Sequence, residues 1–289
     1  MNKQKKIFPL IGTHMSIAGG LHKALLDGQS IGCTTIQIFV KNSRQWLSTT
    51  LTSEAITLFK EKKEETGIMV IAHAGYLINV ASHSPEIEKK SIESLTQELE
   101  RCDELGIEYL VLHPGSYTND FKEDSLYRIS KNINQIYTTK NYNCSILLET
   151  MAGQGSSIGS SFEELAHIIQ HLIIPNKIGI CLDTCHLFAA GYIFNTQNEY
   201  NNLINSLDHI IGLKFLKAIH INNSKTAHNS HVDRHDHLKT GLMPIEAFGY
   251  FISDERLNHI PKILETPKEN GLEKDQENLL ILKSLYKYL

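Results

Sequence analysis

The stretch Ile178-Gly-Ile-Cys-Leu-Asp-Thr-Cys-His186 places Asp183 and His186 directly after a short apolar run. Continuous apolar runs of this length are typical of strands that are buried on both faces of a parallel sheet. Comparable runs recur along the chain, and a helical pattern follows each of them. The sequence therefore predicts eight strands, at residues 8–12, 35–40, 68–72, 109–112, 145–148, 178–182, 216–219 and 262–264.

The segments between these runs carry the signals of amphipathic helices. Ser84 followed by Pro85 predicts a helix N-terminus, and Gly106 stands where that helix would end. Ser160 and Ser161 each precede a glutamate by three residues, which is the spacing of a capping box. Further helices are expected at residues 52–67, 123–139, 197–213 and 273–289.

Eight strands that alternate with helices predict an α/β fold, a single (β/α)8 TIM barrel that spans residues 1–289. An open doubly wound sheet is the alternative. The composition, 41% hydrophobic and 21% charged, is that of a folded protein. No apolar run approaches the ~20 residues that span a bilayer, and the N-terminus lacks the apolar core of a signal peptide. We therefore expect a cytoplasmic protein, with its five cysteines reduced.

Seven of the eight predicted strands end in histidine, aspartate or glutamate. The C-terminal ends of barrel strands converge on one mouth, where catalytic groups of TIM barrels lie. Unpaired carboxylates gathered there would repel one another, and bound cations are the simple way to hold them. These strand ends, with the loop after the seventh strand, supply nine candidate metal ligands: His73, His113, Glu149, Asp183, His186, His220, Asp233, His235 and Glu265.

The chemistry of this ligand set narrows the metal and the reaction. Imidazole mixed with carboxylate suits zinc, manganese or iron. A catalytic zinc takes about three protein ligands, so nine ligands predict two or three ions at the C-terminal mouth. Closely spaced ions stabilise both the attacking and the leaving oxygen in phosphoester hydrolysis.

Several motifs occur in a fixed order along these strands and loops. They are Gly12-Thr-His-Met-Ser-x-Ala-Gly-Gly20, Lys41-Asn-Ser-Arg-Gln-Trp46, His73-x-x-Tyr-Leu-Ile-Asn79, His113-Pro-Gly115, Glu149-Thr-x-Ala-Gly-Gln-Gly155, Asp183-Thr-Cys-His186, Val232-Asp-Arg-His235 and Ile263-Leu-Glu-Thr266. From about Gly12 to Glu265, the sequence resembles the endonuclease IV family of apurinic/apyrimidinic endonucleases, in the xylose-isomerase-like TIM barrel superfamily.

The resemblance implies a trinuclear zinc site, in which manganese or iron can substitute. His73, His113 and Glu149 would hold the first ion, and Glu149 would bridge to a second. The other ligands of the second ion would be Asp183, His220 and Glu265. The ligands of the third ion would be His186, Asp233 and His235.

The resemblance also implies a zinc-dependent endonuclease of base excision repair. It would hydrolyse the phosphodiester 5′ to an abasic site in duplex DNA, leaving a 3′-hydroxyl, and would remove blocked 3′ ends. A metal-bridged hydroxide would be the nucleophile, and the catalytic residues would be Glu149 and Glu265, of which Glu265 would orient the hydroxide.

Double-stranded DNA is the expected partner. By resemblance, Arg44 and Gln45 on one loop and Tyr76 and Leu77 on another would form wedges in a kinked duplex. Several mouth-side cations are expected to reach backbone phosphates: Lys23, Lys41, Arg44, Lys225, Arg234 and Lys239. The formal net charge of −4 is no obstacle, because the six charges of three zinc ions would change it to +2. Trp46 is expected to pack beneath its loop.

The sequence departs from the resemblance in three places. Asn223 stands where an aspartate is usual, so we expect weaker support for a metal ligand. His231 replaces an arginine, which removes one expected phosphate contact, and the loop 238–241 differs. His14 is expected to hydrogen-bond beside the site without binding metal.

Two alternative functions remain open from the sequence. One is a metal-dependent sugar isomerase or epimerase on the same barrel, because the superfamily hosts both chemistries. That enzyme would not need the third ligand set of His186, Asp233 and His235. The other is a non-catalytic protein that binds metal or DNA. Because one chain supplies every ligand, we expect a monomer.

Overall fold

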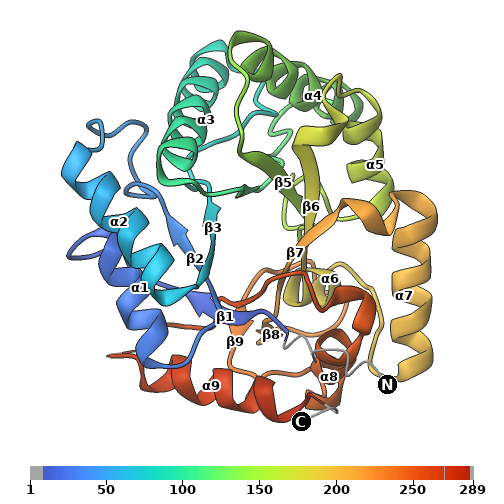
Figure 1. Ribbon diagram of the computed structural model, residues 1–289. Helices are drawn as coiled ribbons and strands as arrows, with labels where there is room; N and C mark the ends of the chain where they lie inside the picture. The colour runs from blue at the N-terminus through green and yellow to red at the C-terminus, as the bar shows by residue number, and fades with distance from the viewer. Residues whose placement is uncertain (1–8, 270, 287–289) are drawn as a thin grey trace, which may run out of the picture.

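The barrel is closed and entirely parallel. The computed structural model describes residues 9–269 and 271–286, and within them the strand order is β1-β10-β7-β6-β5-β4-β3-β2 (Figure 1). Closure confirms the (β/α)8 prediction and excludes the open doubly wound sheet. The strands are β1 (Ile11–His14), β2 (Thr35–Phe39), β3 (Met69–His73), β4 (Tyr109–Leu112), β5 (Ser145–Glu149), β6 (Ile178–Asp183), β7 (Leu216–His220) and β10 (Lys262–Leu264).

The predicted strands fall on these eight, with small shifts at their ends. β1 begins at Ile11 instead of Phe8, which lies outside the described residues, and it extends to His14. β3, β5, β6 and β7 each include the polar residue expected to follow them. The side chains of these terminal residues therefore start from hydrogen-bonded backbone at the mouth.

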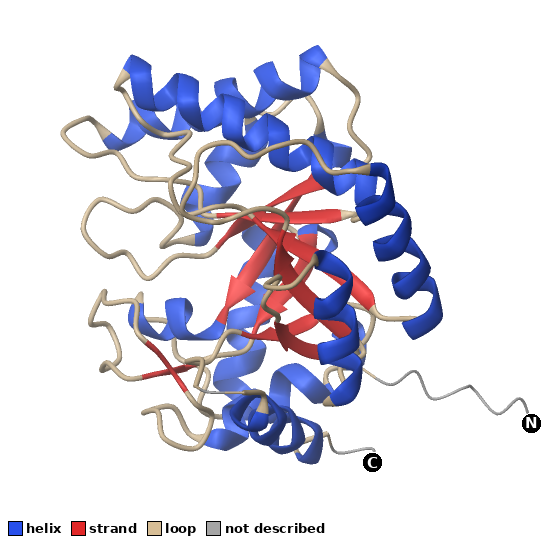
Figure 2. Ribbon diagram, turned by 90° about the vertical axis from the view of Figure 1, so that its left-hand side faces the viewer, coloured by secondary structure: helices blue, strands red, loops and turns tan. Residues whose placement is uncertain are grey.

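Helices surround the strands, and long loops gather at one end of the barrel (Figure 2). In the described segments the α-helices are α1 (Leu21–Ser30), α2 (Ser53–Thr66), α3 (Pro85–Leu105), α4 (Lys122–Thr139), α5 (Phe162–Gln170), α6 (Thr184–Ala189), α7 (Gln197–Ile210), α8 (Ile245–Ser253) and α9 (Glu273–Ser284). Short 3-10 turns lie at Pro175–Lys177, Leu213–Phe215 and Glu255–Leu257. None of these helices is both long and apolar enough to cross a membrane.

The predicted ends of α3 are confirmed, and the predicted capping box at the start of α5 forms only in part. α3 begins at Pro85 and ends before Gly106, whose φ of 66° is favourable for glycine. α5 begins after Ser161, which accepts a hydrogen bond from the Glu164 amide. The Glu164 carboxylate reaches back to the Gly159 and Ser160 amides instead of closing the box on Ser161. Residues 287–289 of the last predicted helix lie outside the described residues.

Two layers of apolar side chains hold the fold. Six side chains fill the barrel interior and are fully buried: Ile71, Val111, Leu147, Cys181, Ala218 and Ile263. A larger cluster packs the outer faces of the strands against the helices. The five cysteines are buried free thiols. This rigid frame fixes the strand ends from which the polar groups project.

One addition to the barrel bears on the site. β8 (Asn223–Ser224) and β9 (His235–Asp236) pair as a short antiparallel sheet after β7. The pairing brings His235 back toward the mouth and orders the loop that carries Asp233.

Candidate metal centre

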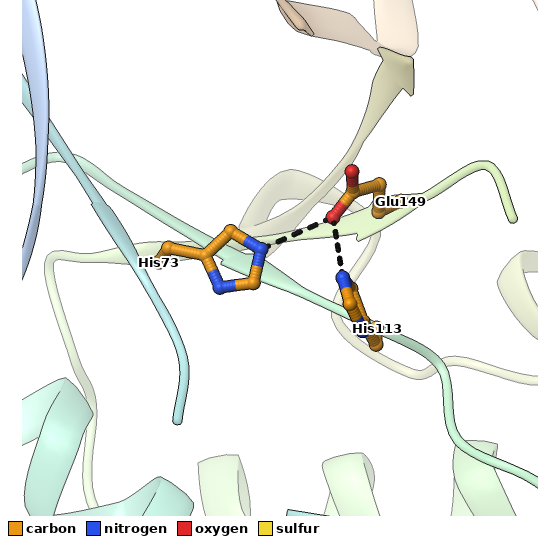
Figure 3. Close-up of side chains that lie close together, drawn as sticks. All are labelled: His73, His113 and Glu149. Carbon is orange, nitrogen blue, oxygen red and sulfur yellow. Dashed lines mark hydrogen bonds and ion pairs between the residues drawn. The ribbon is translucent and has the colours of Figure 1, made fainter. Parts of the chain in front are cut away.

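The first group of converging side chains comes from three neighbouring strands. His73 ends β3, Glu149 ends β5 and His113 follows β4, and their side chains point toward one another (Figure 3). The Glu149 carboxylate oxygen Oε2 lies 3.2 Å from His73 Nε2 and 3.1 Å from His113 Nε2. One nitrogen from each ring and one carboxylate oxygen thus surround a single point.

The second group lies on the other side of Glu149. One donor atom each from Glu149, Asp183, His220 and Glu265 falls within 4.8 Å of the others. His220 Nδ1 lies 2.8 Å from Glu149 Oε1 and 3.2 Å from Glu265 Oε2. Glu149 uses its two oxygens toward the two groups, which is the geometry of a bridging carboxylate.

The third group is built around Asp233. Its two oxygens lie 3.2 Å from His186 Nε2 and 3.4 Å from His235 Nε2. The donor atoms of Asp183, His186 and His235 lie within 4.8 Å of one another. The donor atoms of Cys185, Asp233 and His235 are equally close together. All nine residues predicted from the sequence therefore meet in one continuous cluster at the mouth.

The ring nitrogens that face away from the cluster are anchored. His73 Nδ1, His186 Nδ1 and His235 Nδ1 lie 2.8, 2.7 and 3.2 Å from the carbonyl oxygens of Ala74, Thr150 and Glu265. A carbonyl only accepts, so these nitrogens donate and the opposite nitrogens are the ones that face the cluster. This is the usual arrangement of histidines that bind metal.

Two inward-facing nitrogens lack hydrogen bonds. His186 Nε2 and His235 Nε2 are buried and form no hydrogen bond of good geometry among the described residues, although Asp233 oxygens lie 3.2 and 3.4 Å away. Buried polar atoms are rarely left in this state, because the loss of water is then uncompensated. The donor set and these two atoms fit divalent cations of the zinc, manganese or iron type.

Charge pairing keeps the carboxylates ready to bind metal. Burial alone would raise the pKa of the Glu149 carboxyl, but His220 and His113 hold it well below its usual range. Burial also opposes ionisation of Asp233, yet His186 and His235 lower its pKa to about 2. Burial disfavours the charged form of His186, but Asp183 and Asp233 raise its pKa to about 10, so this imidazole must release a proton when a cation binds. Glu149 and Asp233 are thus ionised at neutral pH, as cation binding requires.

Two supporting residues were not identified from the sequence. Gln37, buried in β2, accepts a hydrogen bond from His220 Nε2 at 2.8 Å and donates to Glu265 Oε1 at 2.5 Å. Asn222 donates to Asp183 Oδ2 and accepts from the Glu265 amide, both at 2.7 Å. Gln37 could have been recognised as a supporting residue because its polar side chain stands between two isoleucines in a buried strand. His14 lies 3.0 Å from Gln37 Nε2, beside the site as expected.

The four predicted DNA wedges lie on two loops at the mouth. Arg44 and Gln45 are exposed on the loop after β2. Tyr76 is 62% exposed and Leu77 38% exposed on the loop after β3. The Tyr76 ring rests edge-on against Phe39, with 5.4 Å between centroids. These side chains are therefore available to a large ligand.

The remaining loop residues divide into exposed and buried groups. Arg234 is exposed beside Asp233, and Trp46 is half-buried, with Lys90 Nζ 6.0 Å from the centroid of its ring. The prediction that Lys41 reaches a phosphate is wrong. Lys41 is 3% exposed and forms an ion pair with Glu98 at 2.9 Å.

Asn223 and His231, two positions where the sequence departs from the family resemblance, make hydrogen bonds to backbone carbonyl groups of nearby loops. Among the hydrogen bonds of the described residues, Asn223 contacts Leu238, Met243 and Ser224 and reaches no residue of the cluster. Asn222, its neighbour, hydrogen-bonds Asp183 and the Glu265 amide instead. The expectation that asparagine at position 223 weakens the support of a metal ligand stays a prediction. His231 has a positive φ of 53° and points its ring at the Ala152 carbonyl, 3.2 Å away.

Comparisons with known proteins agree with this geometry. A family model described as a xylose isomerase-like TIM barrel matches residues 26–285. A protein of Geobacter sulfurreducens named probable endonuclease 4 is 43% identical over 277 residues, covering 95% of this chain and 94% of the relative. The structure of endonuclease IV from Thermus thermophilus is 32% identical, with a TM-score of 0.84 and coverage of 96% and 98%. A D-tagatose 3-epimerase-like protein has a TM-score of 0.73 at 17% identity, a likeness that extends to the fold alone.

Proposed function

The chain belongs to the endonuclease IV family of xylose isomerase-like TIM barrels, and from this premise we propose the reaction that its mouth carries out. The protein is a nuclease, and therefore a hydrolase. We propose that it hydrolyses the phosphodiester 5′ to an abasic site in duplex DNA and leaves a 3′-hydroxyl. The same site would remove blocked 3′ ends, which present a similar phosphate. This activity belongs to base excision repair.

The nine-residue cluster carries this proposal. Its overlapping groups, two of which share Glu149, support binding of three divalent cations, zinc in preference, with manganese or iron as substitutes. Cations bound there would lower the pKa of coordinated water and neutralise charge that develops on the phosphate during hydrolysis. Three ions would also offset the four carboxylates of the cluster, so that a phosphodiester is attracted to the mouth.

The protein's own side chains would orient the reacting groups. Glu265 is 16% exposed, and its carboxylate is held by Gln37 while its amide is held by Asn222. A carboxylate fixed in this way can accept a hydrogen bond from the attacking water and keep that water in line with the phosphorus. Glu149 is fully buried, which favours a role in holding the cluster together.

Duplex DNA is the proposed partner, bound by a single copy of the protein. Arg44, Gln45, Tyr76 and Leu77 would enter the base stack, and Arg234 would contact the backbone. An abasic site costs less to unstack than a paired nucleotide, so selectivity would come from deformability. One chain supplies all nine ligands, which supports a monomer.

Incision of a duplex that carries one tetrahydrofuran abasic analogue tests the proposal. The analogue cannot undergo β-elimination, so a cut must be hydrolytic. With a 5′ label, zinc-loaded protein should yield one 3′-hydroxyl product cut on the 5′ side. Glu265→Gln should lower the rate by about 10²–10⁴-fold, whereas Glu273→Gln, an exposed glutamate of α9, should not.

Two outcomes would contradict this assignment. Folded, metal-loaded protein that leaves the duplex intact would remove the endonuclease proposal and move the sugar epimerase to first place. A product that carries an unsaturated 3′ sugar on a natural abasic site, with no cut of the analogue, would indicate a lyase. Metal content of Glu265→Gln should be measured in parallel, because Glu265 also belongs to the proposed ligand set.

A further inference from the structure

Lys41 and Glu98 form a buried ion pair between the two loops that carry the wedge residues. Lys41 is 3% exposed and Glu98 is 1% exposed. Lys41 lies at the start of the loop after β2, and Glu98 lies on α3. Burying two charges removes them from water at a cost that their attraction often only offsets, so such a pair is weak evidence for added stability.

Each partner reaches backbone in a different loop. Lys41 Nζ donates to the Gln45 carbonyl at 2.6 Å, within the loop of Arg44. Both carboxylate oxygens of Glu98 accept from the Gly75 amide at 3.2 Å, next to Tyr76. The pair therefore connects the backbone of one loop to the backbone of the other.

The two loops also touch directly at this point. A Cβ atom on Gly75 would lie 3.2 Å from the Ser43 carbonyl oxygen and 3.3 Å from Lys41 Nζ. Such contacts are tighter than ordinary packing, so a side chain at position 75 would push the loops apart. The backbone of one loop is thus seated on the backbone of the other.

Neighbouring residues of α3 fix the rest of the loop after β2. Gln97 binds the Ser48 amide and carbonyl, both at 2.8 Å. Arg101 donates to the carbonyl oxygens of Val40 and Thr49 at 2.7 and 2.8 Å. One turn of α3 therefore holds both ends of this loop, and Glu98 is the residue of that turn that also holds the second loop.

We propose that the Lys41–Glu98 pair is a positioning device that sets the loop of Arg44 and Gln45 against the loop of Tyr76 and Leu77, and so governs how tightly duplex DNA is bound and distorted. The inference rests on the proposed function. It assigns no chemistry at the metal cluster to either residue. Preorganised loops lower the cost of binding, because less motion is lost when DNA is bound.

The test uses Glu98→Gln and the double variant Lys41→Met/Glu98→Leu. The double variant removes both charges at once, and apolar replacements of a buried pair often preserve stability. Glu93→Gln is the matched control, because Glu93 also pairs with a lysine on α3 but is 48% exposed. Single-turnover incision of the abasic duplex gives the half-saturating protein concentration and the rate at saturation separately.

We expect the half-saturating concentration to rise about tenfold in the two Glu98 variants, with the saturating rate within about twofold of wild type. Fluorescence of 2-aminopurine opposite the lesion should show reduced distortion, and zinc content should be unchanged. Glu93→Gln should match wild type in all three measurements.

The outcomes separate this inference from the proposed function. Wild-type protein that fails to incise would overturn the function itself. Wild-type incision with unchanged half-saturation and fluorescence in a folded Glu98 variant would overturn the positioning role. Loss of zinc from a Glu98 variant would also overturn the positioning role. So would a fall in the saturating rate as large as the rise in half-saturating concentration, since the pair would then act on His73 and the cluster.

Discussion

Gln37 connects two proposed metal ligands with one amide. Its oxygen accepts from His220 Nε2, which leaves His220 Nδ1 to face Glu149 and Glu265. Its nitrogen donates to Glu265. An amide can serve both because it carries a donor and an acceptor, whereas a carboxylate or an ammonium group could serve only one.

Substituting Gln37 tests that connection. Gln37→Leu should weaken zinc affinity by about 10- to 100-fold, because His220 loses the partner that fixes its tautomer. Competition with a chromophoric chelator would measure the change. Gln276→Leu, on the exposed face of α9, is the control. Equal affinity in both variants would show that the barrel alone orients His220.

Lys262 is a buried cation at the opposite end of β10 from Glu265. It is fully buried, and its ammonium group donates to the carbonyl oxygens of Leu257 and Ile260. Burial lowers the pKa of Lys262 to about 7, with Asp254 acting weakly in the other direction. The folded chain therefore releases this proton near pH 7, whereas the unfolded chain, with an ordinary lysine, keeps it up to about pH 10.

This difference predicts how stability varies with pH. From about pH 7 to 10 the unfolded state binds more protons, so Lys262 should add stability as pH rises, by up to about 1.4 kcal/mol per pH unit. Relative to Lys262→Met, the wild type should gain stability between pH 7 and pH 9 in urea unfolding at constant zinc. Lys60→Met, at an exposed lysine of α2, is the surface control for the same comparison. A pH-independent difference at Lys262 would contradict the prediction.

The segment after β7 shows how a departure in sequence becomes an element of structure. Asn223, on β8, donates to the carbonyl oxygens of Leu238 and Met243 at 2.9 and 3.1 Å. A Cβ atom on Gly241 would collide with the Asn223 side chain at 2.3 Å. The two departures, at position 223 and in the loop 238–241, are therefore one packed unit that closes the loop beneath β8 and β9.

Returning an aspartate to position 223 should disturb this unit. Asn223→Asp would set a carboxylate oxygen against two carbonyl oxygens in a site with no exposure, and should cost about 1–3 kcal/mol of folding free energy. Thermal unfolding of zinc-loaded protein would measure this loss, and zinc content should stay the same. A variant that loses zinc instead would indicate that Asn223 supports the cluster after all.

For the molecule as a whole, local pattern in the sequence predicted the barrel and the convergence of the nine candidate ligands at its mouth. Seven of the nine candidates stand at or near the end of an apolar run, and parallel strand ends meet at one mouth. Asp233 and His235 lie in the loop after β7. Gln37 and Glu98 were out of reach, since their roles depend on contacts between segments far apart in the chain. Lys41 was misjudged for the same reason: a lysine in a loop predicts an exposed charge unless its partner is known.

The net charge of the protein and of its metal cluster predicts how fast the whole protein associates with DNA. Without metal the formal net charge is −4, and four carboxylates lie at the mouth; three divalent cations would bring six positive charges there. Zinc-loaded protein should therefore associate with duplex DNA faster than chelator-stripped protein by about tenfold or more at low salt. The advantage should shrink as ionic strength rises and the Debye length falls below about 10 Å. Stopped-flow anisotropy at two salt concentrations would measure it, with circular dichroism to verify that stripped protein stays folded. Equal rates for folded protein in both states would mean that the cluster does not steer DNA and that surface cations such as Arg44 and Arg234 govern the encounter.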